Sequence, residues 1–146
     1  MTDIHSIADY IIESFSPEEI SLLKLQSLLY FAQGWHLALY DKPLFEEEFD
    51  ARVHGPINPE IYKRFSNGCG LFSLVKSNKV SSIENDLKKF IDKVIEVYGG
   101  FADDQLITLT RFQTPWKLAR KGLADYESCE NKIDKLSMKE YFASII

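Results

Sequence analysis

The sequence predicts a mainly α-helical fold with a minor β part: a compact bundle of about six helices around a central apolar helix, plus a small two-stranded β element. Apolar residues recur at helical spacing along most of the chain. Alternation of apolar and polar residues, typical of a strand, is confined to short stretches near 49–54 and 72–78. A length of 146 residues suits one core, so we expect residues 1–146 to form a single domain.

The central helix is expected over Leu22–Leu39. Its apolar stripes lie side by side at helical spacing, with Leu22, Leu25, Leu29, Ala32, His36 and Leu39 in one and Leu28, Phe31, Trp35 and Ala38 in the other. A helix that is apolar over so wide an arc is covered by other elements on most of its circumference. Pro43 stops it, since proline cannot continue a helix. Its start is open between two N-cap candidates, Ser16 and Ser21.

The other helices are marked by their start and stop signals. These are Ile4–Phe15 with its periodic apolar face, Asn58-Pro59 to Asn67-Gly68, the capping pair Ser81 and Glu84 with a helix to Tyr98, Asp103–Phe112, Thr114-Pro115 to Gly122, and a last helix opened by Ser137 and Glu140.

The two-stranded element is expected to join 49–53 to 72–78. Phe49, Ala51 and Val53 alternate with polar residues, and Gly55-Pro56 closes that strand. Residues 123–136 form the longest weakly patterned loop.

Charge and composition exclude several classes of function. Lys+Arg 17 against Asp+Glu 22 gives a net charge of −5, which argues against nucleic acid or anionic lipid as a partner. No apolar run approaches the roughly 18 residues of a membrane span. The start lacks the pattern of a signal peptide, and two distant cysteines suit free thiols in a reducing compartment. We therefore expect a cytoplasmic protein without a membrane partner.

No motif predicts a metal, a cofactor or a catalytic residue. His36 lies on the apolar stripe of the central helix, where a hydrogen-bonded core imidazole is expected, and His54 precedes Gly-Pro at an exposed turn. Three histidines and two distant cysteines give no zinc spacing. An enzyme that uses His36 or His54 with a carboxylate such as Asp50 stays open as a distant alternative.

Two charge clusters favour surface roles. An exposed loop face is predicted for the cluster of Glu46, Glu47, Glu48 and Asp50, and such a face would be complementary to a basic partner. Lys117, Arg120 and Lys121 share one helix face that could meet phosphate or an acidic protein.

Two sequence blocks resemble a known family. The stretch LLKLQSLLYFAQGWHLALYDKPLF followed by HGPINPEIYKRF is similar to the signature of the Panacea domain, the family of SocA-like and GepA-like phage-associated and antitoxin proteins. The family pattern is LKLQKLLYYAQGWHLA, a GKPLF turn, and A-W-x-x-GPV-x-P-E-x-Y. The later FIDKVIEVYGGFADDQLITLTRFQTPWKLAR and the closing SMKEYFASI resemble its second half. The resemblance covers nearly the whole chain.

Three departures from the family pattern stand out. Ser27 replaces the usual lysine, Asp41 the turn glycine, and Arg52 a common tryptophan. Ser27 and Arg52 are expected to change surface chemistry, and so the choice of partner, more than the fold.

The resemblance implies a non-enzymatic antitoxin that binds a cognate toxin protein directly. A family member acts as an adaptor that delivers its toxin to a protease, so a protease is a further possible partner. A phage accessory protein that binds a host factor is the alternative. For partner contact we expect Gln26, Ser27, Tyr30, Arg52, His54, Gly55 and Pro56, on a polar edge of the central helix beside a rigid turn.

Overall fold

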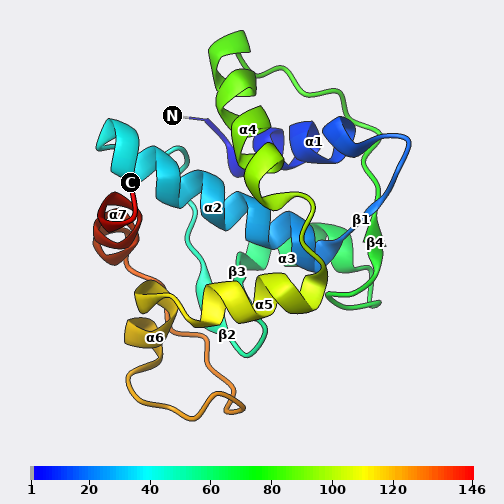
Figure 1. Cartoon of the computed structure of the whole chain (residues 1–146). Coiled ribbons are helices and arrows are strands. Elements are labelled where there is room, and N and C mark those ends of the chain that lie inside the picture. Colours follow the sequence, from blue (N-terminus) through cyan, green and yellow to red (C-terminus); the bar gives the residue numbers. More distant parts are fainter. Residues whose placement is uncertain (1) are drawn as a thin grey trace.

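The computed structural model describes residues 2–146, and within that range the chain forms seven helices and four short strands. Helix α2 (Leu22–Tyr40) runs through the middle of the molecule and the remaining helices surround it (Figure 1). This confirms the mainly α fold with a minor β part. None of the helices in residues 2–146 is both long and apolar enough to cross a membrane.

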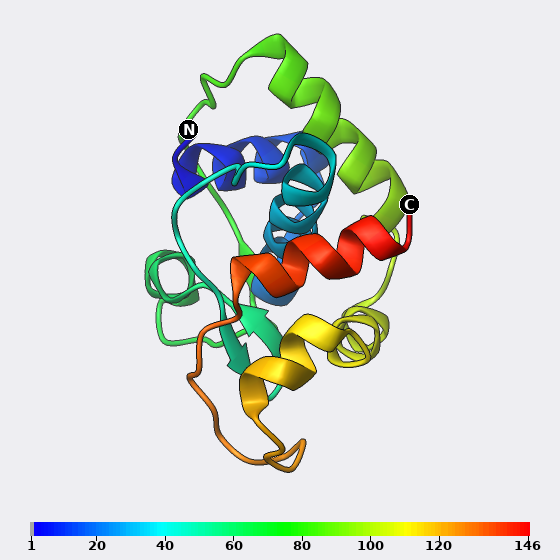
Figure 2. The same ribbon diagram turned by 90° about the vertical axis from the view of Figure 1, so that its left-hand side faces the viewer.

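The surrounding helices cover α2 from several sides. Helices α1 (Ile4–Phe15) and α4 (Asn85–Tyr98) lie on one side, and α7 (Lys135–Ser144) crosses it on another, in front of it in Figure 2. The rest of the cover comes from α3 (Pro59–Ser66) and α5 (Asp103–Arg111), while α6 (Thr114–Arg120) packs between α5 and α7. Every residue from 25 to 34 is buried, as the wide apolar arc predicted.

Two buried glutamines of α2 fasten loops to the helix. The Oε1 of Gln33 accepts from the N–H groups of Leu44 (2.7 Å) and Phe45 (3.4 Å), and its Nε2 donates to the Phe45 carbonyl (2.7 Å). The side chain of Gln26 likewise bonds both the N–H and the carbonyl of Asn58, at 2.8 and 3.0 Å. Gln33 satisfies two backbone N–H groups and a carbonyl, and Gln26 satisfies the Asn58 N–H and adds a second bond to the Asn58 carbonyl, which also accepts from the Tyr62 N–H.

The strands pair differently from the prediction. Strand β2 (Asp50–Arg52) forms an antiparallel hairpin with β3 (Gly55–Ile57), and β1 (Ile20–Ser21) pairs with β4 (Leu74–Val75). The expected pairing of 49–53 with 72–78 is therefore wrong. A two-residue turn at 53–54 costs little loop entropy, and the φ of +120° at Gly55 permits it.

The N-cap of α2, left open between Ser16 and Ser21, is Ser21, whose Oγ accepts from the N–H of Lys24 at 3.0 Å. Two other helix starts differ from those expected. The Ser81 hydroxyl donates to the Ser6 carbonyl at 3.1 Å, so it does not cap α4. The last helix begins at Lys135, before Ser137, which shortens the preceding loop.

A candidate partner-binding groove

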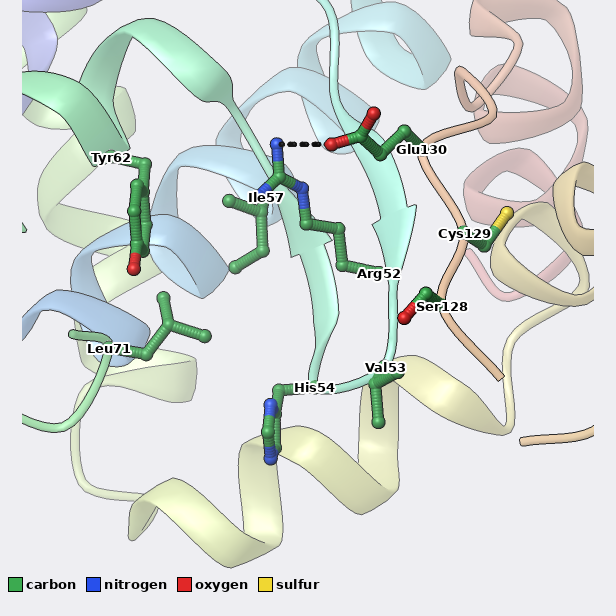
Figure 3. Close-up of a pocket in the computed structure, with 9 residues that line it drawn as sticks. All are labelled: Arg52, Val53, His54, Ile57, Tyr62, Leu71, Ser128, Cys129 and Glu130. Atoms are coloured by element: carbon green, nitrogen blue, oxygen red, sulfur yellow. Dashed lines mark ion pairs between the residues drawn. The ribbon is translucent and has the colours of Figure 1, made fainter. Parts of the chain in front are cut away.

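A groove of about 580 Å³ opens where the β2–β3 hairpin meets α3 and the 121–134 loop (Figure 3). Its volume is that of a typical ligand site, with room for the anchoring side chains of a bound protein. The residues that line it are Arg52, Val53, His54, Ile57, Tyr62, Leu71, Ser128, Cys129 and Glu130.

Helix α6 holds the hairpin in place. The indole Nε1 of Trp116 donates to the Arg52 carbonyl, and Nη1 of Arg120 donates to the Ala51 carbonyl, both at 2.8 Å. On the same edge of β2 as the Arg120 bond, the N–H of Ala51 donates to the Asn131 carbonyl at 2.8 Å. These bonds fix the backbone that carries the groove residues, so the surface is preorganised for binding.

Arg120 also fixes the loop that forms one wall of the groove. Its Nη2 donates to the carbonyls of Ala124 (2.8 Å) and Glu127 (2.5 Å), and its guanidinium lies 4.6 Å from the centre of the Trp116 ring. The residue is 1% exposed, and within residues 2–146 no carboxylate pairs with it. The prediction of a surface role for Arg120 is therefore wrong, although Lys117 and Lys121 are exposed.

Arg52 belongs to a cluster of charges around a buried carboxylate. Oδ2 of Asp50 accepts from Nε (3.3 Å) and Nη2 (3.0 Å) of Arg52, and its Oδ1 accepts from Nζ of Lys132 at 2.5 Å. Glu130 approaches Nη2 of Arg52 from the loop, at 3.8 Å (Figure 3). Asp50 is 2% exposed, so it is not part of an exposed acidic face, whereas Glu46 and Glu48 are exposed as expected.

An aromatic pair continues the groove at its hairpin end. His54 is exposed and its ring meets that of Phe72 edge to face, with the centroids 5.4 Å apart. Phe72 is itself 55% exposed. Aromatic, histidine and arginine side chains gathered at a rigid depression are typical of the residues that dominate protein interfaces.

The structure separates the seven residues expected to contact a partner. Arg52 and His54 line the groove, while Gly55 and Pro56 lie behind it as buried parts of β3. The remaining three, on α2, are at most 4% exposed: Gln26, Ser27 and Tyr30. Partner contact stays a prediction for the set; of its members His54 is exposed and the Arg52 side chain is 31% exposed.

The buried polar residues of α2 have partners inside the protein. Gln26 binds Asn58, and the Tyr30 hydroxyl donates to Oε1 of Gln113 at 2.9 Å. Burial raises the pKa of Tyr30 well above its ordinary value. Ser27 is 4% exposed, so the expectation that it changes surface chemistry is not met.

The histidines are not brought together with Asp50. Nδ1 of His36 lies 2.7 Å from the Lys42 carbonyl, on a half-buried ring at the far end of α2, and both oxygens of Asp50 are taken by cations. Within residues 2–146 neither His36 nor His54 is hydrogen-bonded to a carboxylate, and no three His, Cys, Asp or Glu side chains could hold a metal ion.

A second groove, of about 770 Å³, lies at that far end of α2. His36, Tyr40 and Phe90 form its aromatic side, with ring centroids 4.8 to 6.0 Å apart. Its residues do not include any of those predicted for contact, so the smaller groove is the better candidate.

Sequence reasoning missed Tyr62, Leu71, Phe72 and Glu130 in and around the candidate groove. Their signals were weak: Tyr62 is part of the family's P-E-x-Y pattern, Phe72 opens the alternating 72–78 stretch that predicted a strand and not a contact, and Leu71 and Glu130 lie in segments without clear periodicity. Only the folded chain brings the 71–72 and 128–130 segments to the hairpin.

The signature segments place this chain in a defined class. It belongs to the family described as "Antitoxin SocA-like, Panacea domain", whose pattern matches residues 25–117, more than half of the chain. The match runs from the first turn of α2 to Lys117 in α6, so it includes the hairpin and Trp116.

One relative illustrates the family. The chain is 25% identical over 134 residues to Antitoxin SocA of Caulobacter vibrioides, and the match covers 82% of this chain and 71% of the relative. No solved structure matches the chain.

Proposed function

We propose that this protein is a non-enzymatic antitoxin that neutralises a cognate toxin by binding it directly. Membership of the SocA-like antitoxin family carries the proposal. The preorganised groove supports it, because a rigid surface loses little conformational entropy when a partner binds. In this function the protein covers or distorts the active surface of the toxin and performs no chemistry of its own.

The contact surface that we propose centres on Arg52, His54 and Phe72. These residues combine a planar cation with two exposed rings, and the hairpin beneath two of them is held by Trp116 and Arg120. Interfaces concentrate their binding free energy in a few residues of this kind.

Co-expression tests the function. The product of the neighbouring gene is expressed from an inducible promoter in a bacterial host, with and without this chain, and growth is followed. We expect growth arrest that this chain relieves, and a complex of the two proteins on size-exclusion chromatography. Absence of both relief and complex contradicts the proposal.

Paired substitutions test the surface. Replacing both His54 and Phe72 with alanine should abolish relief of growth arrest, since it removes two exposed rings of the groove. The matched control is Phe112→Ala, which removes a 73% exposed phenylalanine elsewhere, and it should leave relief intact. Equal relief of growth arrest by both variants would show that the toxin does not bind at the groove.

A role as a protease adaptor or as a host-factor binder makes different predictions in the same cells. An adaptor shortens the half-life of the bound toxin, measured after protein synthesis is stopped, whereas steric neutralisation leaves it unchanged. A host-factor binder forms a complex with a host protein and does not relieve toxicity.

A further inference from the structure

The groove contains a cation with spare hydrogen-bonding capacity. Arg52 is 31% exposed and uses Nε and Nη2 on Asp50, but within residues 2–146 no group accepts a hydrogen bond from its Nη1. A guanidinium can offer two parallel N–H groups to a carboxylate. Arg52 therefore presents an unused donor edge at the surface of the groove.

The charges around Arg52 leave room for a second anion. The single negative charge of Asp50 is shared by Arg52 and Lys132, which leaves one positive charge in excess. Glu130 compensates it only loosely, since its side chain is 80% exposed and 3.8 Å from Nη2. A surface contact of this kind contributes little free energy and is readily exchanged.

Apolar side chains lie beside this cation. Ile57 is fully buried under the groove, and Tyr62 and Leu71 form the adjoining side, as Figure 3 shows. The guanidinium carbon of Arg52 is 5.9 Å from the centre of the Tyr62 ring. An apolar surface next to a cation is complementary to an apolar side chain next to a carboxylate.

We propose that the groove binds a segment of the partner protein that carries an acidic residue beside an aromatic or aliphatic one. The carboxylate of the partner takes the place of Glu130 on Arg52, and the apolar side chain packs against Tyr62 and Leu71. Identification of this partner with the toxin rests on the proposed function. The charge of this segment is opposite in sign to that of the basic partner expected from the acidic cluster at 46–50.

A basic segment fits the same groove poorly. Both oxygens of Asp50 are already bonded to cations and the residue is 2% exposed, so it offers nothing to a further cation. Glu130 is the remaining acid in the lining, and Arg52 repels a cation that approaches it.

Binding of short peptides to the full chain tests this chemistry without the toxin. The probes are N-acetyl-Phe-Asp-amide, its neutral analogue N-acetyl-Phe-Asn-amide, and N-acetyl-Phe-Lys-amide, titrated into isotope-labelled protein and followed by NMR. We expect saturable shifts of the Arg52 Nε–H and of the amides of Val53 and Cys129 with the Asp peptide. The Asn and Lys peptides should bind at least about 5-fold more weakly.

Substitutions at two positions should change the affinity for the Asp peptide in opposite directions. Glu130→Gln removes the internal competitor and should strengthen binding of the Asp peptide about 2- to 5-fold. Arg52→Ala should weaken it about 10-fold or more, and Arg52→Lys should fall between, because lysine keeps the charge but not the planar fork.

A surface ion pair away from the groove supplies the controls. Lys76 is 79% exposed and its Nζ lies 3.4 Å from a carboxylate oxygen of Glu19, which is 36% exposed. Lys76→Ala and Glu19→Gln should leave peptide binding unchanged. They also show whether loss of an exposed ion pair by itself disturbs the fold.

Three results overturn the proposal: stronger binding of the Lys peptide, weaker binding in Glu130→Gln, or no saturable shift at the groove with the Asp peptide. These results do not depend on toxin neutralisation, which is judged by growth. Relief of growth arrest together with any of them would refute the acidic anchor and leave the antitoxin function standing. Binding of the Asp peptide without relief of growth arrest would support the acidic anchor and contradict the antitoxin function.

Discussion

Replacement of Gly34 with alanine separates helix propensity from tertiary packing. Gly34 lies in the middle of α2, where α7 crosses it. A Cβ at this position would meet the ring of Phe142, at 2.2 Å from Cε2, 2.3 Å from Cδ2 and 2.8 Å from Cζ. All three distances are shorter than carbon atoms tolerate, so either the ring or the helix has to move.

The magnitude follows from two opposing effects. In a helix interior, alanine is favoured over glycine by about 1 kcal/mol. Overpacking of a close-packed core costs about 1–3 kcal/mol, and occasionally more. The Phe142 ring is fully buried, with the rings of Trp35 and Tyr30 at centroid distances of 5.3 and 5.8 Å, so it has little space to yield. We expect Gly34→Ala to lower the free energy of unfolding by about 2 kcal/mol.

Urea unfolding followed by far-UV circular dichroism measures the effect. The matched control is Gly100→Ala, because no atom lies within 4 Å of a Cβ built there, and its effect should stay within about 0.5 kcal/mol. Phe142→Leu should cost less in the Gly34→Ala background than in the natural chain, since it relieves the clash. Stabilisation of about 1 kcal/mol by Gly34→Ala would refute this reasoning and leave helix propensity as the deciding effect.

Three further variants test the buried polar contacts. Gln26→Leu leaves the N–H of Asn58 buried without its partner, while the Asn58 carbonyl keeps its bond from the Tyr62 N–H. The free energy of unfolding in urea should therefore fall by about 1–3 kcal/mol, and a loss below about 0.5 kcal/mol would contradict the role of Gln26. Arg120→Lys keeps the charge, but a lysine cannot reach the three carbonyls that Arg120 bonds. The free energy of unfolding should fall by about 2–3 kcal/mol, and amide hydrogen exchange in residues 121–130 should become faster. Unchanged exchange would argue against the role of Arg120 in holding the loop. Burial raises the pKa of Tyr30 in the folded protein, so the tyrosine ionises first in the unfolded chain and stability falls as pH rises above about 10. Between about pH 8 and about pH 11, the urea midpoint should therefore decline less steeply for Tyr30→Phe than for the natural chain. An identical decline would contradict this reasoning.

Local signals predicted most of the helical fold. The apolar stripes of α2 and the Asn58-Pro59 start of α3 were read correctly, because helical periodicity and capping depend on residues close in sequence. The capping pair at Ser81 was wrong, because the Ser81 hydroxyl donates to the distant Ser6 carbonyl, and local spacing does not reveal such a contact. Of the two N-cap candidates for α2, Ser21 caps the helix through its bond to the Lys24 N–H.

The candidate groove was only half visible in the sequence. Arg52 and His54 stood out because of the family pattern and the Gly-Pro turn beside them. The polar residues of α2 were misleading: Gln26 and Ser27 look like the polar edge of a helix, but every residue of α2 from 25 to 34 is buried. A buried glutamine that bonds the backbone of a distant loop has no signature in local spacing.

The sequence by itself determined that this chain is a helical member of an antitoxin family, built around one apolar helix. Helical periodicity, helix caps and the signature blocks depend on residues close in sequence, so they can be recognised without the structure. Only the tertiary structure showed that Gln26 and Gln33 of the signature segment bond the backbone of loops. It also showed that β2 pairs with β3, and that Arg52, Tyr62 and Glu130 line one groove. Those outcomes depend on which segments distant in sequence come together to bury the core, and that is settled by packing of the whole chain.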